Sequence, residues 1–310
     1  ELLAVAQTER LFFMALFWRD QRELLRENAA LTRQVLDISE KQLAAGALSR
    51  SDVAIARLDD AAARRRAELG EANYQTALLD LRRQLNVSLD QPLDVRGSLK
   101  DLLFSPASSA AAHSQIGTEQ LPASVPQMSQ QLAANRPDVL AAQSDFDASR
   151  ANLNLAHANR VPDLQIGPYY QLTDGGATLW GFRGQSDSPV LNTGMPLVRQ
   201  RGAELIQRQT VWQQLQARAS IEAQAAIDRY ERARRIAAES GTTSELPEEL
   251  SKLEAQFQAG EIDLIRIVTA RTSLLAARQS QLDILSELAQ AAAALTAATG
   301  LPPEVIVQVR

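Results

Sequence analysis

Two stretches of this chain match without a gap when one is shifted by 214 positions along the sequence. Gln42–Arg64 reads QLAAGALSRSDVAIARLDDAAAR, and Gln256–Arg278 reads QFQAGEIDLIRIVTARTSLLAAR. Each stretch has a glycine, Gly46 or Gly260, among helix-forming residues. Glycine ends helices readily because it adopts the left-handed backbone conformation. The match therefore predicts a structural duplication in which each copy is a pair of long helices joined at a tight Ala-Gly tip.

The spacing of Gly and Pro predicts where these helices begin and end. No Gly or Pro occurs from Leu3 to Ala45, and Ser49 or Ser51 offers an N-cap for the helix that follows. Pro137 suits the first position of another helix. We expect helices over 3–45, from Ser49 or Ser51 to about 85, and over 137–159, 195–240 and 263–299, with an interruption at 241–250 after which helix continues over 250–259 to the second tip. The apolar run 11–18, LFFMALFW, is too short to span a membrane and is expected in the core.

One segment departs from this helical pattern. From Asp163 to Leu172 apolar and polar residues alternate, which is typical of a strand, and Asp174-Gly175-Gly176 predicts a turn. Ten residues at about 3.3 Å each reach about 33 Å, enough for a tilted strand to cross a bilayer. The alternative is a half-buried strand in a soluble sheet. The candidate membrane-facing residues are Leu164, Ile166, Tyr170, Leu172, Trp180 and Phe182.

Composition and motifs argue against several classes of function. The net charge of -5 disfavours a nucleic-acid binder with a broad basic surface, and the absence of cysteine excludes disulfides and Cys-based zinc sites. His113 and His157 have no second ligand at a useful spacing. There is no phosphate-binding loop, dinucleotide-binding turn, G-x-S-x-G or HExxH motif. We therefore expect no enzyme activity, cofactor or metal site, and no nucleic-acid partner.

The tip motifs carry a resemblance to a known family. Ala45-Gly46 is followed by Leu48 and Ser49, Ala259-Gly260 is followed by Ile262 and Asp263, and both copies continue into an Ala-Arg pair. The segment 134–167 adds an RPD helix start and a proline before the strand. The copies end in RRQLNVS and LTAATGLP, with Asn86 where glycine is usual. In this order, the motifs resemble the TolC-like outer-membrane efflux family (outer membrane factor) over essentially the whole chain.

The resemblance implies a fold and a role. The fold would be mainly α, with two long antiparallel coiled-coil hairpins forming part of a trimeric α-barrel, plus a small transmembrane β-hairpin. The protein would be a homotrimer with strands in outer-membrane lipid and helices in the periplasm. It would export small molecules or ions passively, driven by an inner-membrane pump through a periplasmic adaptor. The alternative is a periplasmic coiled-coil adaptor or scaffold without a pore.

The chain has one strand pair where the family has two. By the 214-residue offset, Glu1 corresponds to about position 215, so the first copy lacks a counterpart of 137–215. We therefore expect an N-terminal part, with another helix and β-hairpin, to precede Glu1 in the full protein. The expected organisation is a first hairpin over 1–90, an extended connector over 91–136, a helix over 137–160, the β-hairpin over 161–194, a second hairpin over 195–300 and a tail over 301–310.

The tips are the candidate site for contact with the adaptor. The residues proposed there are Gly46, Leu48, Ser49, Gly260, Ile262 and Asp263, and Leu48, Ser49, Ile262 and Asp263 are expected to be exposed. The tips also fit plain hairpin turns, in which glycine meets a conformational need. Asp263 fits two interpretations: a carboxylate that complements the helix dipole, or one member of an acidic ring at a tunnel mouth.

Overall fold

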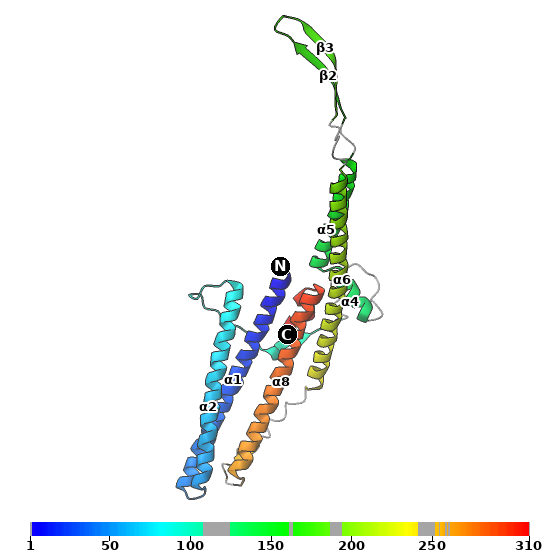
Figure 1. The fold of residues 1–310 in the computed structure, drawn as a ribbon. Coiled ribbons are helices and arrows are strands. Elements are labelled where there is room, and N and C mark those ends of the chain that lie inside the picture. Colours follow the sequence, from blue (N-terminus) through cyan, green and yellow to red (C-terminus); the bar gives the residue numbers. More distant parts are fainter. Residues whose placement is uncertain are drawn as a thin grey trace. The chain divides into compact units, whose positions relative to one another are not determined.

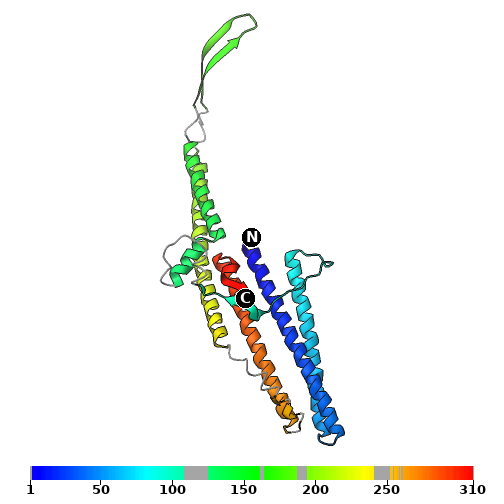
Figure 2. The same cartoon turned by 180° about the vertical axis from the view of Figure 1, so that it is seen from behind.

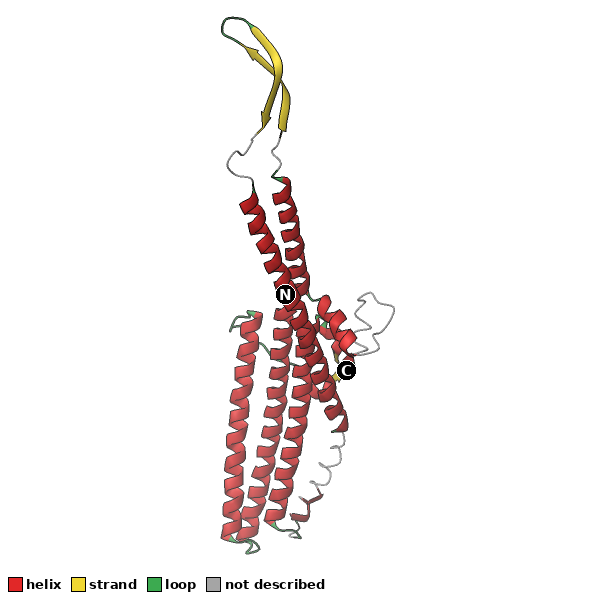
Figure 3. Cartoon of the chain, turned by 45° about the vertical axis from the view of Figure 1, so that its right-hand side comes forward, coloured by secondary structure: helices red, strands yellow, loops and turns green. Residues whose placement is uncertain are grey.

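The structure, a computed structural model, describes residues 2–107, 125–160, 164–186, 194–240, 252–253, 255–257, 259 and 261–309. These residues are mainly helical, as Figure 3 shows, with two small antiparallel sheets. The chain divides into two compact units, one of residues 1–132 and 222–310, the other of residues 133–221. The expected fold class, mainly α with long helices and a small β-hairpin, is confirmed.

Three long helices form the frame of the first unit. They are α1 (Leu2–Ala44), α2 (Arg50–Leu85) and α8 (Leu264–Thr299). α1 lies between the other two and packs against both (Figures 1 and 2). The last part of α6 (Met195–Glu239) also belongs to this unit.

The contact between α1 and α2 is close where Gly70 lies. A β-carbon at position 70 would approach Cδ1 of Leu25 to 2.9 Å, so the glycine permits this approach. Further along the pair, Phe13 and Leu16 are buried with Leu81, in a cluster that Ala289 of α8 completes. The apolar run 11–18 therefore contributes to the core, as expected.

The ends of α2 and α8 show the duplication in their backbones. α2 ends at Asn86 and α8 at Gly300, 214 positions later, and both residues are left-handed, with φ of 53° and 75°. Asn86 replaces glycine here because asparagine tolerates this conformation better than most residues.

The segment expected to be an extended connector contains regular structure instead. A 3₁₀ turn η1 (Leu99–Asp101), a strand β1 (Leu102–Phe104) and a helix α4 (Val125–Ala134) lie within 91–136. The C-terminal tail likewise forms α9 (Pro303–Ile306) and a strand β4 (Val307–Val309) that pairs antiparallel with β1. Three-residue strands this short leave no detectable alternation, and their pairing partners are remote in sequence, so the sequence pattern missed them.

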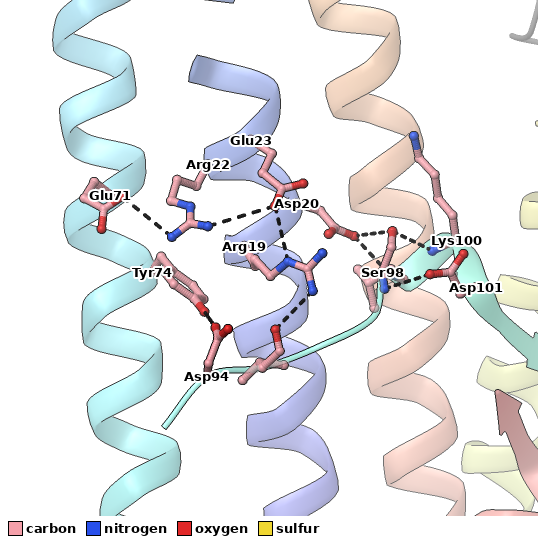
Figure 4. Close-up of polar contacts among 12 residues, drawn as sticks. Arg19, Asp20, Arg22, Glu23, Glu71, Tyr74, Asp94, Ser98, Lys100 and Asp101 are labelled. Carbon is pink, nitrogen blue, oxygen red and sulfur yellow. Dashed lines mark hydrogen bonds and ion pairs between the residues drawn. The ribbon is translucent and has the colours of Figure 1, made fainter. Parts of the chain in front are cut away.

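A buried aspartate of α1 fixes the start of η1. The Oδ2 atom of Asp20 accepts hydrogen bonds from the Ser98 hydroxyl (2.8 Å) and the Leu99 N–H (2.9 Å), as Figure 4 shows. Arg19 donates to the carbonyl of Val95 at 3.1 Å. Together these bonds fasten the connector to α1.

The second unit contains the helix that Pro137 begins and the predicted strands. α5 (Pro137–Ala158) and the first part of α6 are linked by a stacked pair, Phe146 and Trp212, with ring centroids 5.5 Å apart. β2 (Leu164–Leu172) and β3 (Thr178–Ser186) form an antiparallel pair.

Removing the Asp20 carboxylate should destabilise the protein measurably. Asp20→Ala leaves a buried N–H and hydroxyl without this acceptor, so we expect the free energy of unfolding to fall by about 2–3 kcal/mol. Asp80→Ala is the control: its carboxylate pairs with Arg83 at 3.1 Å on the surface, and its loss should cost about 0.5 kcal/mol or less. Thermal unfolding followed by helical circular dichroism measures both. Equal losses would contradict the anchoring role of Asp20.

Glu9 of α1 should make stability depend on pH. Burial of the Glu9 carboxyl raises its pKa from 4.5 to about 7. Between pH 4.5 and 7 the folded protein keeps a proton that the unfolded chain releases, so stability falls as pH rises through this window. Glu9→Gln replaces the carboxyl by a neutral amide and so removes the free-energy cost of ionising a buried group. The variant should match the parent near pH 4 and exceed it by up to about 3 kcal/mol above pH 8. A pH-independent difference between the two melting curves would refute this.

Candidate functional site

The first helix tip is closed by backbone hydrogen bonds around Gly46. The Gly46 N–H donates to the Leu43 carbonyl (2.9 Å), and the Ala47 N–H donates to the Gln42 carbonyl (2.8 Å). This pair of bonds, with Gly46 at φ 74°, is the Schellman arrangement that ends many helices. The glycine is required by its conformation, since no atom lies within 4 Å of where its β-carbon would be.

The second tip repeats two of these bonds at equivalent positions. The Ala259 N–H donates to the Ala255 carbonyl (3.0 Å), as that of Ala45 does to Lys41 (3.1 Å). The Glu261 N–H donates to the Gln256 carbonyl (2.9 Å), matching the bond from Ala47 to Gln42. Gly260 lies outside the described residues. The sequence match thus extends to a match in backbone geometry.

The helices that leave the two tips also begin at equivalent residues. Ser49 caps α2 with φ −85° and ψ 158°, and Asp263 caps α8 with φ −77° and ψ 148°. The Ser49 hydroxyl accepts from the Asp52 N–H, whose carboxylate in turn accepts from the Ser49 N–H. The Asp263 side chain makes no such capping bond, so its exposed carboxylate acts on the helix only through its charge.

The two tips pack against each other within one chain. Val53 of α2 and Ile267 of α8, equivalent in the two copies, are both buried in one apolar cluster with Phe257. The Gln42 side-chain amide donates to the Phe257 carbonyl at 3.1 Å. We call residues 42–53 and 255–267 the paired tips, because one apolar cluster joins them.

Exposure divides the proposed tip residues into two groups. Gly46, Ser49 and Asp263 are exposed. Leu48 and Ile262 are instead half-buried and pack on the apolar cluster, which corrects the expectation that both are exposed. The reason is physical: an apolar side chain directly after a tight turn lowers the free energy by folding back over the buried residues beneath it.

The matched arginines of the two copies have different surroundings. Arg57 is 64% exposed at its side chain and pairs with Glu40 at 3.0 Å. Arg271 is 3% exposed, donates to the Asn28 carbonyl at 3.2 Å and has Asp59 at 3.9 Å. α8 packs on α1 at Arg271, whereas within the described residues no third helix covers Arg57 on α2. The sequence showed the equivalence of these arginines but not this difference, which depends on the neighbours of each helix.

The strand pair separates two kinds of side chain. The register places Tyr170 opposite Trp180 and Pro168 opposite Phe182, so most apolar residues of the two strands share one face, while Leu179, paired with Gln171, lies on the other. Tyr170 and Trp180 meet edge to face at 4.7 Å. Trp180 and Phe182 are 78% and 86% exposed. The opposite face carries Gln165, Tyr169, Gln171, Arg183 and Gln185. Of the candidate residues, Leu164 is placed only by its backbone.

No cluster of three or more His, Cys, Asp or Glu residues suited to a metal ion occurs among the described residues. His157 is exposed on α5, and His113 lies outside these ranges. In the same ranges, every helix is too short or too polar to cross a membrane.

Comparison with characterised proteins gives distant relatives. No family model matches the chain. The chain is 24% identical over 299 residues to the cation efflux system protein CusC of Escherichia coli K12, covering 91% of this chain and 61% of that protein. It is 27% identical over 258 residues to the pyoverdine export outer membrane protein OpmQ of Pseudomonas putida, covering 75% of this chain and 52% of that one. The chain thus spans about 60% of the length of the CusC relatives it matches.

Solved structures show the same fold. A crystal structure of CusC superposes with a TM-score of 0.72 at 19% identity, covering 96% of this chain and 68% of that chain. The resemblance inferred from the tip motifs, to TolC-like outer-membrane channels, is therefore confirmed at the level of the fold.

The matched arginines allow a controlled test of packing at the tips. Arg271→Ala should lower the free energy of unfolding by about 3 kcal/mol, because it breaks a buried interaction between α8 and α1. Arg57→Ala removes the same side chain from the equivalent exposed position and should cost less than about 1 kcal/mol. Thermal unfolding of both variants provides the comparison. Equal costs for the two variants would contradict the energetic difference that we assign to the burial of Arg271.

Proposed function

We propose that this chain, which has the fold of the TolC-like outer-membrane efflux channels, is a subunit of a passive export duct. Its strands would cross the bacterial outer membrane and its long helices would stand in the periplasm. An inner-membrane pump would drive small molecules or ions into the duct through a periplasmic adaptor. The relatives named above are a cation efflux protein and an outer-membrane pyoverdine export protein, which supports the proposal.

The observation that carries the proposal is the two-sided strand pair. Nine-residue strands at about 3.3 Å per residue are about 30 Å long, close to the thickness of the hydrocarbon core. One face exposes Ile166, Trp180 and Phe182, while the other carries glutamines. In water such an apolar face would favour aggregation. In a membrane it would meet lipid while the polar face lined an aqueous path.

A homotrimer would cover a second exposed apolar surface. α2 buries one side against α1 but exposes Leu58 (70%), Leu69 (64%), Ile55 and Leu79 on another. Ile55 and Leu69 are 14 positions apart, and Leu58 and Leu79 are 21 apart, so the four residues occupy two positions of a seven-residue repeat, which is the pattern of a coiled-coil contact. In the described part of the chain no other segment covers this stripe. A neighbouring subunit would supply the missing helix.

The paired tips are the proposed docking surface for the adaptor. Gly46, Ser49 and Asp263 are exposed there, and the apolar cluster beneath holds both turns together. Leu48 and Ile262 would support this surface from below rather than form it.

The second candidate, a periplasmic adaptor or scaffold, differs in a measurable way. A duct needs detergent for extraction and sediments with the outer membrane, and it conducts ions in a planar bilayer. Both measurements on the full-length protein test the proposal. A protein that is extracted by salt alone and forms no channel would favour the scaffold.

Subunit assembly gives a separate test on α2. Leu58→Asp with Leu69→Asp places charge in the proposed contact and should reduce the cross-linked trimer severalfold. An intact trimer in the double variant would place the subunit contact elsewhere.

Two matched glycine variants test whether the adaptor docks at the tip. Gly46→Leu should reduce efflux in cells severalfold while the trimer persists. Gly97→Leu is the control, since Gly97 also has positive φ (95°) and open space but lies in the connector. Each change costs about 1 kcal/mol of backbone strain, so a difference in efflux reports the tip itself. Equal efflux from both variants would refute docking at this turn.

A further inference from the structure

The polar face of the strand pair carries a single charge. Between residues 164 and 186 the only ionisable side chains besides tyrosine are Asp174, in the turn, and Arg183, in β3. Arg183 lies on the face of Gln165, Gln171 and Gln185, opposite to the face of Trp180 and Phe182. Arg183 is therefore surrounded by neutral residues on this face of the strand pair.

The immediate neighbours of Arg183 leave its guanidinium uncovered. Gly167 stands directly across from it on β2, and Gly181 precedes it on the same face of β3. A β-carbon added at Gly167 would meet nothing within 4 Å. Arg183 is exposed, and within the described part of the chain no carboxylate pairs with it. Among the described residues, the two glycines therefore leave the positive charge of Arg183 unshielded.

We propose that Arg183 makes the membrane segment of the duct select for anionic solutes. This inference rests on the proposed function, in which the polar face of β2 and β3 lines the conducting path. Every subunit would then contribute one Arg183, and the symmetry of the assembly would place these guanidinium groups in a ring. Rings of Arg or Lys favour anions in pores, and substitutions facing the lumen alter selectivity.

The geometry identifies a class of cargo. An unpaired guanidinium attracts carboxylates and phosphates through charge and through paired N–H donors. Organic anions and small inorganic anions would be concentrated at this level of the duct, and cations would be disfavoured. Asp163 and Asp187 continue the same alternation in the sequence but lie outside the described residues. The experiment therefore measures the net selectivity of the native protein first.

The test uses the full-length protein in planar bilayers with a KCl gradient. The reversal potential should show preference for chloride over potassium. Arg183→Gln should lower the ratio of chloride to potassium permeability by about threefold. Arg183→Glu should reverse the preference, and Arg183→Lys should retain it. Arg199→Gln, which removes the same charge from an exposed position on α6, should leave the ratio unchanged.

A second variant keeps Arg183 and offsets its positive charge with a nearby carboxylate. Gly167→Asp places a carboxylate directly opposite Arg183, where β-carbons of paired residues lie about 5 Å apart. The single variant should reduce anion preference as Arg183→Gln does. Adding Arg183→Gln to it should lower the preference further, because the carboxylate is then unpaired.

The outcomes separate the two proposals. If the parent forms no channel, the proposed function fails. If it conducts but is cation-selective, or if its reversal potential is the same in Arg183→Glu, the duct stands and the role of Arg183 is refuted.

Discussion

The packing of α1 against two helices is the constraint on which the first unit depends. One side of α1 meets α2 at the distance that Gly70 permits, and the other meets α8 through buried apolar residues. The same helix supplies Asp20, which fixes the connector, and Gln42, which reaches the second tip. A change on α1 therefore affects the connector and both tips together.

The two copies match in the backbone of their tips and differ in their environment. Their tips share capping geometry and hydrogen bonds, yet Arg271 is buried between helices while Arg57 lies in solvent. In addition, α2 exposes an apolar stripe that no described segment covers. This uncovered stripe motivates the proposed contact with a second subunit.

The two faces of the strand pair differ in polarity. Its apolar face exposes large aromatic side chains, which suits lipid. Its opposite face presents three glutamines and one arginine beside Tyr169 and Leu179, and this more polar face suits water. The antiparallel register keeps these sets apart, because residues directly opposite in paired strands lie on the same face.

The sequence by itself determined the duplication, the turns and the alternation of the strands, because these are local properties of spacing and backbone preference. The glycines and caps of the tips and the start of α5 at Pro137 were predictable for this reason. Only the tertiary structure decided that Leu48 and Ile262 fold inward, that β1 pairs with β4, and that Arg271 is buried but Arg57 is not. Each of these depends on which distant segment lies alongside, and burial is a property of that neighbour as much as of the residue itself.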